Sequence, residues 1–360
     1  MTNKKRISKF EFLRVIAMYL IVLHHSIVHG ALSISANQLK LHPINASILS
    51  VLESGGKIGV FLFVLITGYF MINSNITLKK IIRLWLPILF WSLIWYLIMG
   101  GVSGYSITVK GLIKSIFPII SAQYWFMTAY FFMYLLIPFL NIIVKNIVSK
   151  KKVIYAIVLG IVLIVASTSA FFESNAGSAL LNFCVVYCWG GLIRTYHSKI
   201  NQSLNAKLMS IFIFLELVGI ELPLIGFLLT GKEQLLKISS KFVVAPSTLF
   251  MVLIAVTFFI YVSFWKDNYY PWINKIAATT FGIYLISDNN NVREFLWNNL
   301  LHMHTIISKN YAVIYVIVAS LVVFIVCSLI EALRKKIFSK FENYIGNKAQ
   351  RLQDKLLSRL

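Results

Sequence analysis

The chain has 360 residues, of which 59% are hydrophobic and 13% are charged, and its mean hydropathy is +0.80. A soluble domain carries about 25% charged residues, so this composition excludes a soluble globular protein, a disordered chain and a collagen-like repeat. The 34 Lys and Arg against 12 Asp and Glu give a net charge of +22, which in a soluble protein would indicate nucleic acid as a partner. In a membrane protein, cationic cytoplasmic loops explain the same excess, so we expect a lipid bilayer as the partner and no nucleic acid.

Ten apolar segments approach the length of about 20 residues that a helix needs to span a bilayer. They cover residues 10–29, 51–72, 82–101, 123–144, 153–171, 179–196, 208–230, 242–265, 275–288 and 311–333. The ninth is short, and we expect it to continue through the polar run 287–291 into 292–300. The sequence therefore predicts an all-α, polytopic bundle of about ten transmembrane helices within residues 1–333, followed by a basic tail, 334–360.

The positions of the cations predict how this bundle is oriented. With the N-terminus inside, 25 of the 34 Lys and Arg fall on the cytoplasmic side or in the C-terminal tail. This bias obeys the positive-inside rule, so we expect both termini in the cytoplasm and the protein in the plasma membrane. The tail mixes apolar residues with cations and is expected to lie on the anionic inner leaflet as an amphipathic helix.

The first apolar segment contains the strongest candidate functional residues. Arg14 and His25 are eleven residues apart, which on a helix is three turns plus about 20°, so both side chains share one face about 16 Å apart. Glu11 lies one turn before Arg14 on nearly the same face, whereas His24 is about 100° away and is expected to be structural. The alternative is that Arg14 reaches the inner interface and His25 caps the outer end. Ionisable residues inside a membrane are functional candidates, and we favour a functional pair.

Two further groups of charged residues lie at the ends of predicted spans. Glu53 and Lys57 form an i,i+4 pair that can neutralise itself at the start of the second span. Lys79, Lys80 and Arg83 stand at the start of the third span. Positive-inside anchoring explains them, and they would also form an anion-binding mouth.

Other polar or reactive residues in the spans carry less information. Glu216 and Glu221 lie in the seventh segment and could serve a proton path, an acceptor pocket or pairing with cations. Cys184, Cys188 and Cys327 lie in apolar runs without the spacing of a disulfide framework or a zinc site. We expect neither a disulfide nor a metal site.

Five motifs occur in an order that resembles the membrane-bound acyltransferase 3 family. They are the R-x10-H pattern in FLRVIAMYLIVLHH, GGKIGVFLFVLITGYF (55–70), LKKIIRLWLP (78–87), QYWFMTAYFFMYLLIP (123–138) and FGIYLISDNN (281–290). One position departs from the family pattern, because Ser287 stands where a histidine commonly follows Tyr-Leu-Ile. The role of that histidine would be absent here or taken over by Asp288, His302 or His304.

The resemblance implies transfer of an acetyl group from cytoplasmic acetyl-CoA to a hydroxyl of a surface polysaccharide or its lipid-linked precursor. His25 would be the general base or the acyl carrier, because an imidazole with a reference pKa near 6.5 can do either. Acetyl-CoA would be the only cosubstrate, with no metal. The donor would bind at the residues Arg14, Lys79, Lys80 and Arg83. Candidate substrate-binding residues are Glu53, Lys57, Trp125, Asp288 and Asn289.

Two alternatives remain at the level of the sequence. One is succinyl transfer to an amino-sugar polymer, and the other is a non-enzymatic exporter of polysaccharide or of a small polar substrate. Association into a homo-oligomer also stays open.

Overall fold

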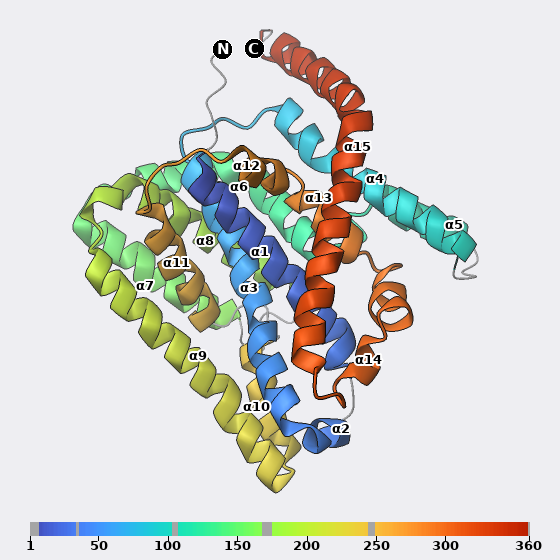
Figure 1. The fold of residues 1–360 in the computed structure, drawn as a ribbon. Coiled ribbons are helices and arrows are strands. Elements are labelled where there is room, and N and C mark those ends of the chain that lie inside the picture. Colours follow the sequence, from blue (N-terminus) through green and yellow to red (C-terminus); the bar gives the residue numbers. More distant parts are fainter. Residues whose placement is uncertain (1–6, 34–35, 103–106, 168–174, 244–248, 359–360) are drawn as a thin grey trace.

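The computed structural model describes residues 7–33, 36–102, 107–167, 175–243 and 249–358. Within these ranges every regular element is a helix (Figure 1). The all-α prediction is therefore confirmed for the part of the chain that the structure describes.

Six of the described helices are long and apolar enough to cross a membrane. They are α1 (Ser8–Ser26) with its π-helical extension η1 (Ile27–Ala31), α3 (Pro43–Met71), α4 (Leu78–Val102), α6 (Trp125–Lys145), α9 (Gln202–Thr230) and α15 (Ala312–Leu357). Other helices are α2 (Ala36–Leu41), α5 (Val109–Ile116), α7 (Lys150–Ser167), α8 (Asn175–Tyr196), α10 (Glu233–Val243) and α11 (Leu249–Ser263). The count of ten spans and the cytoplasmic position of the termini stay predictions.

The ninth predicted segment is a broken helix. It forms α12 (Pro271–Ala277) and α13 (Thr280–Ser287), and the chain then turns before the π-helical η3 (Phe295–Leu300) and the short α14 (Met303–Ile306). Non-helical backbone inside a membrane protein must be covered by protein or water. Ser287, Asp288 and Asn289, at the end of α13, are at most 1% exposed, so protein covers this break.

The last helix, α15, runs without interruption from the tenth predicted span into the tail. Its C-terminal part contacts the start of α4, where Gln353 accepts a hydrogen bond from the backbone N–H of Leu78 (2.8 Å) and Arg83 donates to Asn343 (2.6 Å). Where the tenth predicted span meets the tail, the buried Arg334 of α15 forms an ion pair with Glu331. Glu331 also accepts a hydrogen bond from Trp91 of α4 (2.8 Å). These contacts fix the tail against the bundle at the end where Figure 1 places both termini.

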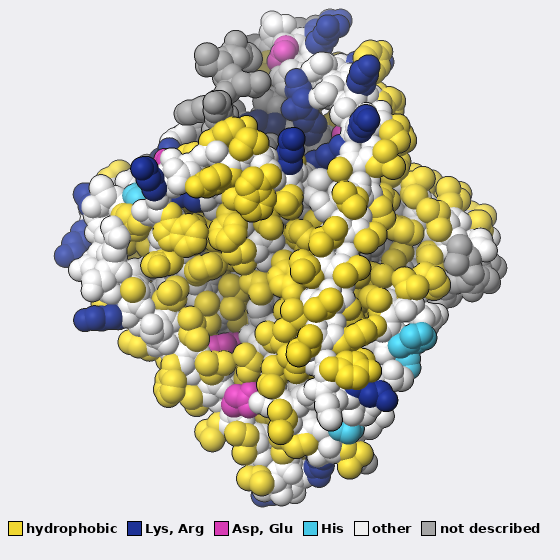
Figure 2. Space-filling model, in the orientation of Figure 1, with side chains coloured by type: hydrophobic (Ala, Val, Ile, Leu, Met, Phe, Trp, Pro, Cys, Tyr) yellow, Lys and Arg dark blue, Asp and Glu magenta, His cyan; other side chains and the backbone are white. Residues whose placement is uncertain are grey.

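Helix α1 lies at the centre of the bundle, packed against α3, α11, α12, α13 and α15. On the face shown in Figure 2, apolar side chains cover the middle, and Lys and Arg gather near the C-terminal end of α15. Since lipid tails are themselves apolar, this belt is what a membrane-embedded bundle presents to the bilayer.

Close packing of α3 on α8 depends on glycine. A Cβ at Gly68 would overlap the carbonyl oxygen of Tyr187, and one at Gly190 would overlap that of Leu65. We therefore expect Gly68→Ala to destabilise the protein by about 1–3 kcal/mol, because the helices must move apart. Gly101→Ala is the matched control, since nothing described lies within 4 Å of its Cβ position. Thermal unfolding in detergent measures both; equal melting temperatures would contradict this packing.

The predicted orientation can be tested by cysteine labelling. In a variant without the three native cysteines, single cysteines at Lys150 or Lys355 are expected to resist an impermeant thiol reagent in intact cells. Single cysteines at Asn37 or Asn175 are expected to react. Labelling at Lys150 from outside would reverse or redraw the predicted topology.

Candidate functional site

The end of α1 and the π-helical turn η1 bring two histidines to one face of the first span. His25 and His29 are one turn apart, and their ring centroids are 5.6 Å from each other. A π-helical turn inside an α-helix is frequent at functional sites. Here η3 stabilises η1, because the Asn298 side chain of η3 donates a hydrogen bond to the His29 carbonyl (3.0 Å).

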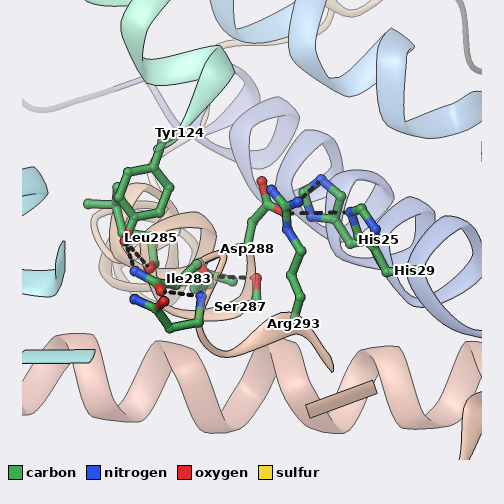
Figure 3. A network of polar contacts seen from close by, with 10 residues as sticks. His25, His29, Tyr124, Ile283, Leu285, Ser287, Asp288 and Arg293 are labelled. Atoms are coloured by element: carbon green, nitrogen blue, oxygen red, sulfur yellow. Dashed lines mark hydrogen bonds and ion pairs between the residues drawn. The ribbon is translucent and has the colours of Figure 1, made fainter. Parts of the chain in front are cut away.

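Both imidazoles face Asp288, the residue at which α13 ends (Figure 3). The distance from Nε2 to Asp288 Oδ1 is 3.5 Å for His25 and 3.8 Å for His29. Arg293 donates from Nε to the same oxygen at 2.8 Å. The Asp288 side chain is 1% exposed, and a buried carboxylate needs such a charged partner. Arg293 therefore anchors the carboxylate that the two histidines share.

Aromatic side chains enclose this centre. The Tyr284 ring, one turn before Asp288 on α13, lies 6.0 Å from the His25 ring and 5.9 Å from the Tyr124 ring. Tyr124, at the start of α6, donates to the Leu285 carbonyl (3.0 Å) and accepts from the Asn289 amide (2.5 Å). These contacts hold residues 285–289, which cover the end of α13 and the start of the following turn, against the start of α6.

Three buried polar atoms lie at this centre, His25 Nδ1, Asp288 Oδ2 and Tyr284 Oη, and none makes a hydrogen bond of good geometry with a described residue. The Tyr284 hydroxyl and the Asp288 carboxylate are nevertheless near enough to interact with each other. Buried polar groups are almost always paired with protein or water. The arrangement therefore leaves Nδ1 of His25 for a water or a ligand, beside the Tyr284 and Asp288 side chains.

The charged pair on α3 lies beside the same centre. The ammonium of Lys57 sits over the Trp125 ring, 4.4 Å from its centroid, and is close enough to Asp288 to attract it. Glu53 is buried, and its carbonyl oxygen lies 2.7 Å from Nδ1 of His24. His24 thus points to α3 and away from Asp288, and its structural role stays a prediction.

Arg14 and Tyr284 both line a pocket of about 300 Å³, and we call it the Arg14 pocket. Its polar lining also includes Tyr130, Thr280 and Lys335, and the rest is mostly apolar. The Arg14 guanidinium forms an ion pair with Glu11, and Lys335 donates to the Ala278 carbonyl. Since Tyr284 also touches His25, this pocket reaches the buried centre from the Arg14 end of the first helix.

The other predicted donor residues do not line this pocket. Lys80 donates to the Ser74 hydroxyl (2.6 Å), and Arg83 donates to Asn343. Lys79 lies against Gly346 of α15. Leu84, next to Arg83 in the chain, does line the Arg14 pocket.

Ser287 does not take the place of a second histidine. Its hydroxyl donates to the Ile283 carbonyl (2.9 Å) in its own helix, while the next residue, Asp288, faces His25. Sequence reasoning missed His29 and Arg293. The His25-x3-His29 spacing was visible as an i,i+4 pair, whereas nothing in the sequence pairs Arg293 with Asp288.

His25, His29 and Asp288 also offer the ligand types that divalent transition metals use, and their ligand atoms lie within 4.8 Å of one another. Arg293, however, places a permanent positive charge on the same Asp288 oxygen and opposes a cation there. We therefore interpret the group as acid–base machinery. The expectation that no metal binds stays a prediction.

These features define a multi-pass helical membrane protein with a buried His–Asp centre at the end of a pocket. A family model described as an acyltransferase domain matches residues 7–332, and the chain belongs to the acyltransferase 3 family. The resemblance found in the sequence is thereby confirmed. No curated protein and no solved structure gives a significant match.

Proposed function

We propose that the protein is a membrane O-acetyltransferase. It would move an acetyl group from cytoplasmic acetyl-CoA to a hydroxyl of a surface polysaccharide or its lipid-linked precursor. The observation that carries this proposal is the buried group of His25, Asp288 and Tyr284, in which Nδ1 of His25 has no hydrogen-bond partner among the described residues and Tyr284 also lines the Arg14 pocket. Family membership supports an acyltransferase, and the site gives that activity a base and a hydroxyl donor.

In the proposed reaction, Asp288 accepts from Nε2 of His25 and leaves Nδ1 to take a proton from the acceptor hydroxyl. The hydroxyl oxygen attacks the thioester carbonyl, the carbon–sulfur bond breaks, and the proton passes through His25 to the departing thiolate. The Tyr284 hydroxyl, which interacts with Asp288 here, would donate to the oxyanion that develops on the carbonyl oxygen. The 3.5 Å separation between His25 and Asp288 leaves room for the pair to tighten when substrate binds.

A second route uses the same atoms. Nδ1 of His25 could attack the thioester itself, hold the acetyl group and then pass it to the acceptor. The two routes differ in a measurable way, because only the second leaves label on the protein when acetyl-CoA is added without acceptor.

The Arg14 pocket is the proposed entry for the donor. Its apolar side chains suit the pantetheine arm, and Arg14 and Lys335 in its lining supply positive charge for the phosphates of coenzyme A. Lys79, Lys80 and Arg83 lie outside this lining, and their part in donor binding stays a proposal. Family membership does not specify this donor. The proposal of acetyl-CoA rests on the resemblance in the sequence and on the two cations of the pocket.

Arg14→Ala is expected to raise the KM for acetyl-CoA about ten-fold, since a charge-assisted contact to an anion is worth about 1.5–3 kcal/mol. Arg14→Lys is expected to restore part of the loss, because a lysine keeps the charge but not the planar fork. Steady-state kinetics in membranes measure both. Lys150→Gln, an exposed cation on α7, serves as the control, and a normal KM in Arg14→Ala would assign Arg14 a structural role.

The proposal is tested by incubating purified, reconstituted protein with acetyl-CoA and the polysaccharide fraction of the native membrane. Release of the free thiol in step with new base-labile O-acetyl groups is the expected result. Succinyl-CoA in the same assay tests the succinyltransferase alternative. Movement of polysaccharide without any thiol release would instead support an exporter.

A further inference from the structure

A second pocket lies at the opposite end of α13 from the Arg14 pocket. The N-terminal part of α13 lines the Arg14 pocket, whereas the residues just after its C-terminal end line a polar pocket of about 230 Å³. Its lining includes Tyr96, Lys114, Ser121, Gln123, Asn290 and Asn291. We call this the polar pocket.

The wall of the polar pocket is joined directly to the buried centre. Asn291 donates its backbone N–H to the Asn289 side chain (2.9 Å), and Asn289 donates to Tyr124 (2.5 Å). Asp288 precedes this run, and Gln123 precedes Tyr124 in the chain. A molecule in the polar pocket would therefore contact the turn of backbone that directly follows Asp288.

The lining offers the groups that recognise a polyhydroxylated ring. Side-chain amides of Gln123, Asn290 and Asn291 can donate and accept hydrogen bonds. The buried Ser92 hydroxyl donates to the Ser115 carbonyl (2.8 Å) and also contacts the Gln123 amide, which leaves the other polar atom of that amide for a ligand. The Tyr96 hydroxyl is committed to the backbone of Thr108 at 2.9 and 2.7 Å, so its aromatic ring is what it offers.

The charge of the lining is one-sided, because it contains the cation of Lys114 and no carboxylate. Helix α5 presents Gly111, Lys114 and Ser115 to the pocket, and its other side exposes apolar side chains such as Val109 and Ile113. An amphipathic helix of this kind lies in a membrane interface. The pocket thus opens beside lipid, and its size suits one sugar ring, being below the roughly 300–1,000 Å³ of pockets for drug-sized ligands.

We propose that the polar pocket binds the acceptor as a single sugar unit bearing an anionic group, with that group on Lys114. This inference rests on the proposed function, since it takes acetyl transfer at His25 as given. The anion is the carboxylate of an acidic sugar or the phosphate of a sugar phosphate. Donor and acceptor would then approach the buried centre from the two ends of α13, and an amino sugar with a positive charge would be disfavoured.

Binding is measured first, without acetyl-CoA, so that it does not depend on transfer. Glucuronate, glucose 1-phosphate and glucose are titrated against wild-type protein in nanodiscs by calorimetry. An anionic sugar is expected to bind wild type about ten-fold more tightly than it binds Lys114→Gln or Asn290→Ala. Lys110→Gln, which changes an exposed cation on the same helix outside the pocket, is the matched control. If glucuronate loses affinity in Lys114→Gln, Lys114 binds the carboxylate of an acidic sugar. If glucose 1-phosphate loses affinity, Lys114 binds the phosphate of a sugar phosphate.

The inference is overturned if all three sugars bind Lys114→Gln and Asn290→Ala as they bind wild type. It is also overturned if inorganic phosphate binds as tightly as the sugar phosphate, because the pocket would then hold an anion and no sugar. Lys114-dependent sugar binding in a protein that transfers no acetyl group would refute the proposed function and leave the pocket standing. Acetyl transfer with an unchanged acceptor KM in Lys114→Gln would refute the pocket alone.

Discussion

His25→Ala is expected to reduce acetyl transfer about 10²–10⁴-fold, the contribution of a positioned general base. The reason is geometric. His25 is the only histidine of the described structure whose ring contacts Tyr284 while its Nε2 faces Asp288, and its Nδ1 is one of the unpaired buried atoms. The rate is measured with labelled acetyl-CoA in membranes, after the amount of folded protein has been equalised by fluorescence-detected gel filtration.

His24→Asn is the matched control for that experiment. His24 is the neighbouring buried histidine, but its Nδ1 is used by the Glu53 carbonyl oxygen, and an asparagine can keep a hydrogen bond there. We expect this variant to transfer acetyl groups within a few-fold of wild type. If His24→Asn were as impaired as His25→Ala, histidine packing and not chemistry would explain both losses.

Asp288→Asn is expected to lower transfer about 10²-fold or more. The change removes the charge that orients His25 and leaves Arg293 without its carboxylate. Because His25 and Asp288 act as one unit, the double variant His25→Ala/Asp288→Asn is expected to be no slower than His25→Ala alone. Initial rates of the two single variants and the double variant, measured together, test this directly.

Ser287→Ala is the control for Asp288→Asn. Ser287 is adjacent, fully buried and bonded only to its own helix, so its removal is expected to leave the rate within a few-fold of wild type. Multiplicative losses in the double variant, or a larger loss in Ser287→Ala than in Asp288→Asn, would show that Asp288 does not serve His25.

The sequence predicts the all-α class of the fold and the relative placement of several candidate residues, whose roles stay predictions. Hydropathy is a property of each segment alone, so the helices α1, α3, α4, α6, α9 and α15 follow from it. The helical repeat places Arg14 and His25 on one face and His24 on another, and the structure puts the first two beside α13 and His24 against Glu53. Asp288 also follows from the sequence, as a candidate replacement for the histidine missing at Ser287.

What the sequence could not predict depends on contacts between distant residues. Lys57 and Trp125 are far apart in the chain and meet as a cation–π pair only because α3 and α6 pack together. The Arg293–Asp288 pair depends on the tight turn after α13. The sequence groups Lys79, Lys80 and Arg83 with Arg14 only because all four are positively charged. In the structure, Lys80 donates a hydrogen bond to Ser74 and Arg83 donates one to Asn343.

Dual labelling of the donor tests the central proposal most directly. The protein is reconstituted in vesicles that contain the acceptor, and acetyl-CoA with ¹⁴C in the acetyl group and ³²P in the nucleotide is added on the side of the Arg14 pocket. If His25 and Asp288 transfer acetyl groups between two pockets, ¹⁴C accumulates in the acceptor while ³²P stays outside as free coenzyme A. Joint entry of both labels, or an unchanged ¹⁴C transfer in His25→Ala, would contradict the proposal.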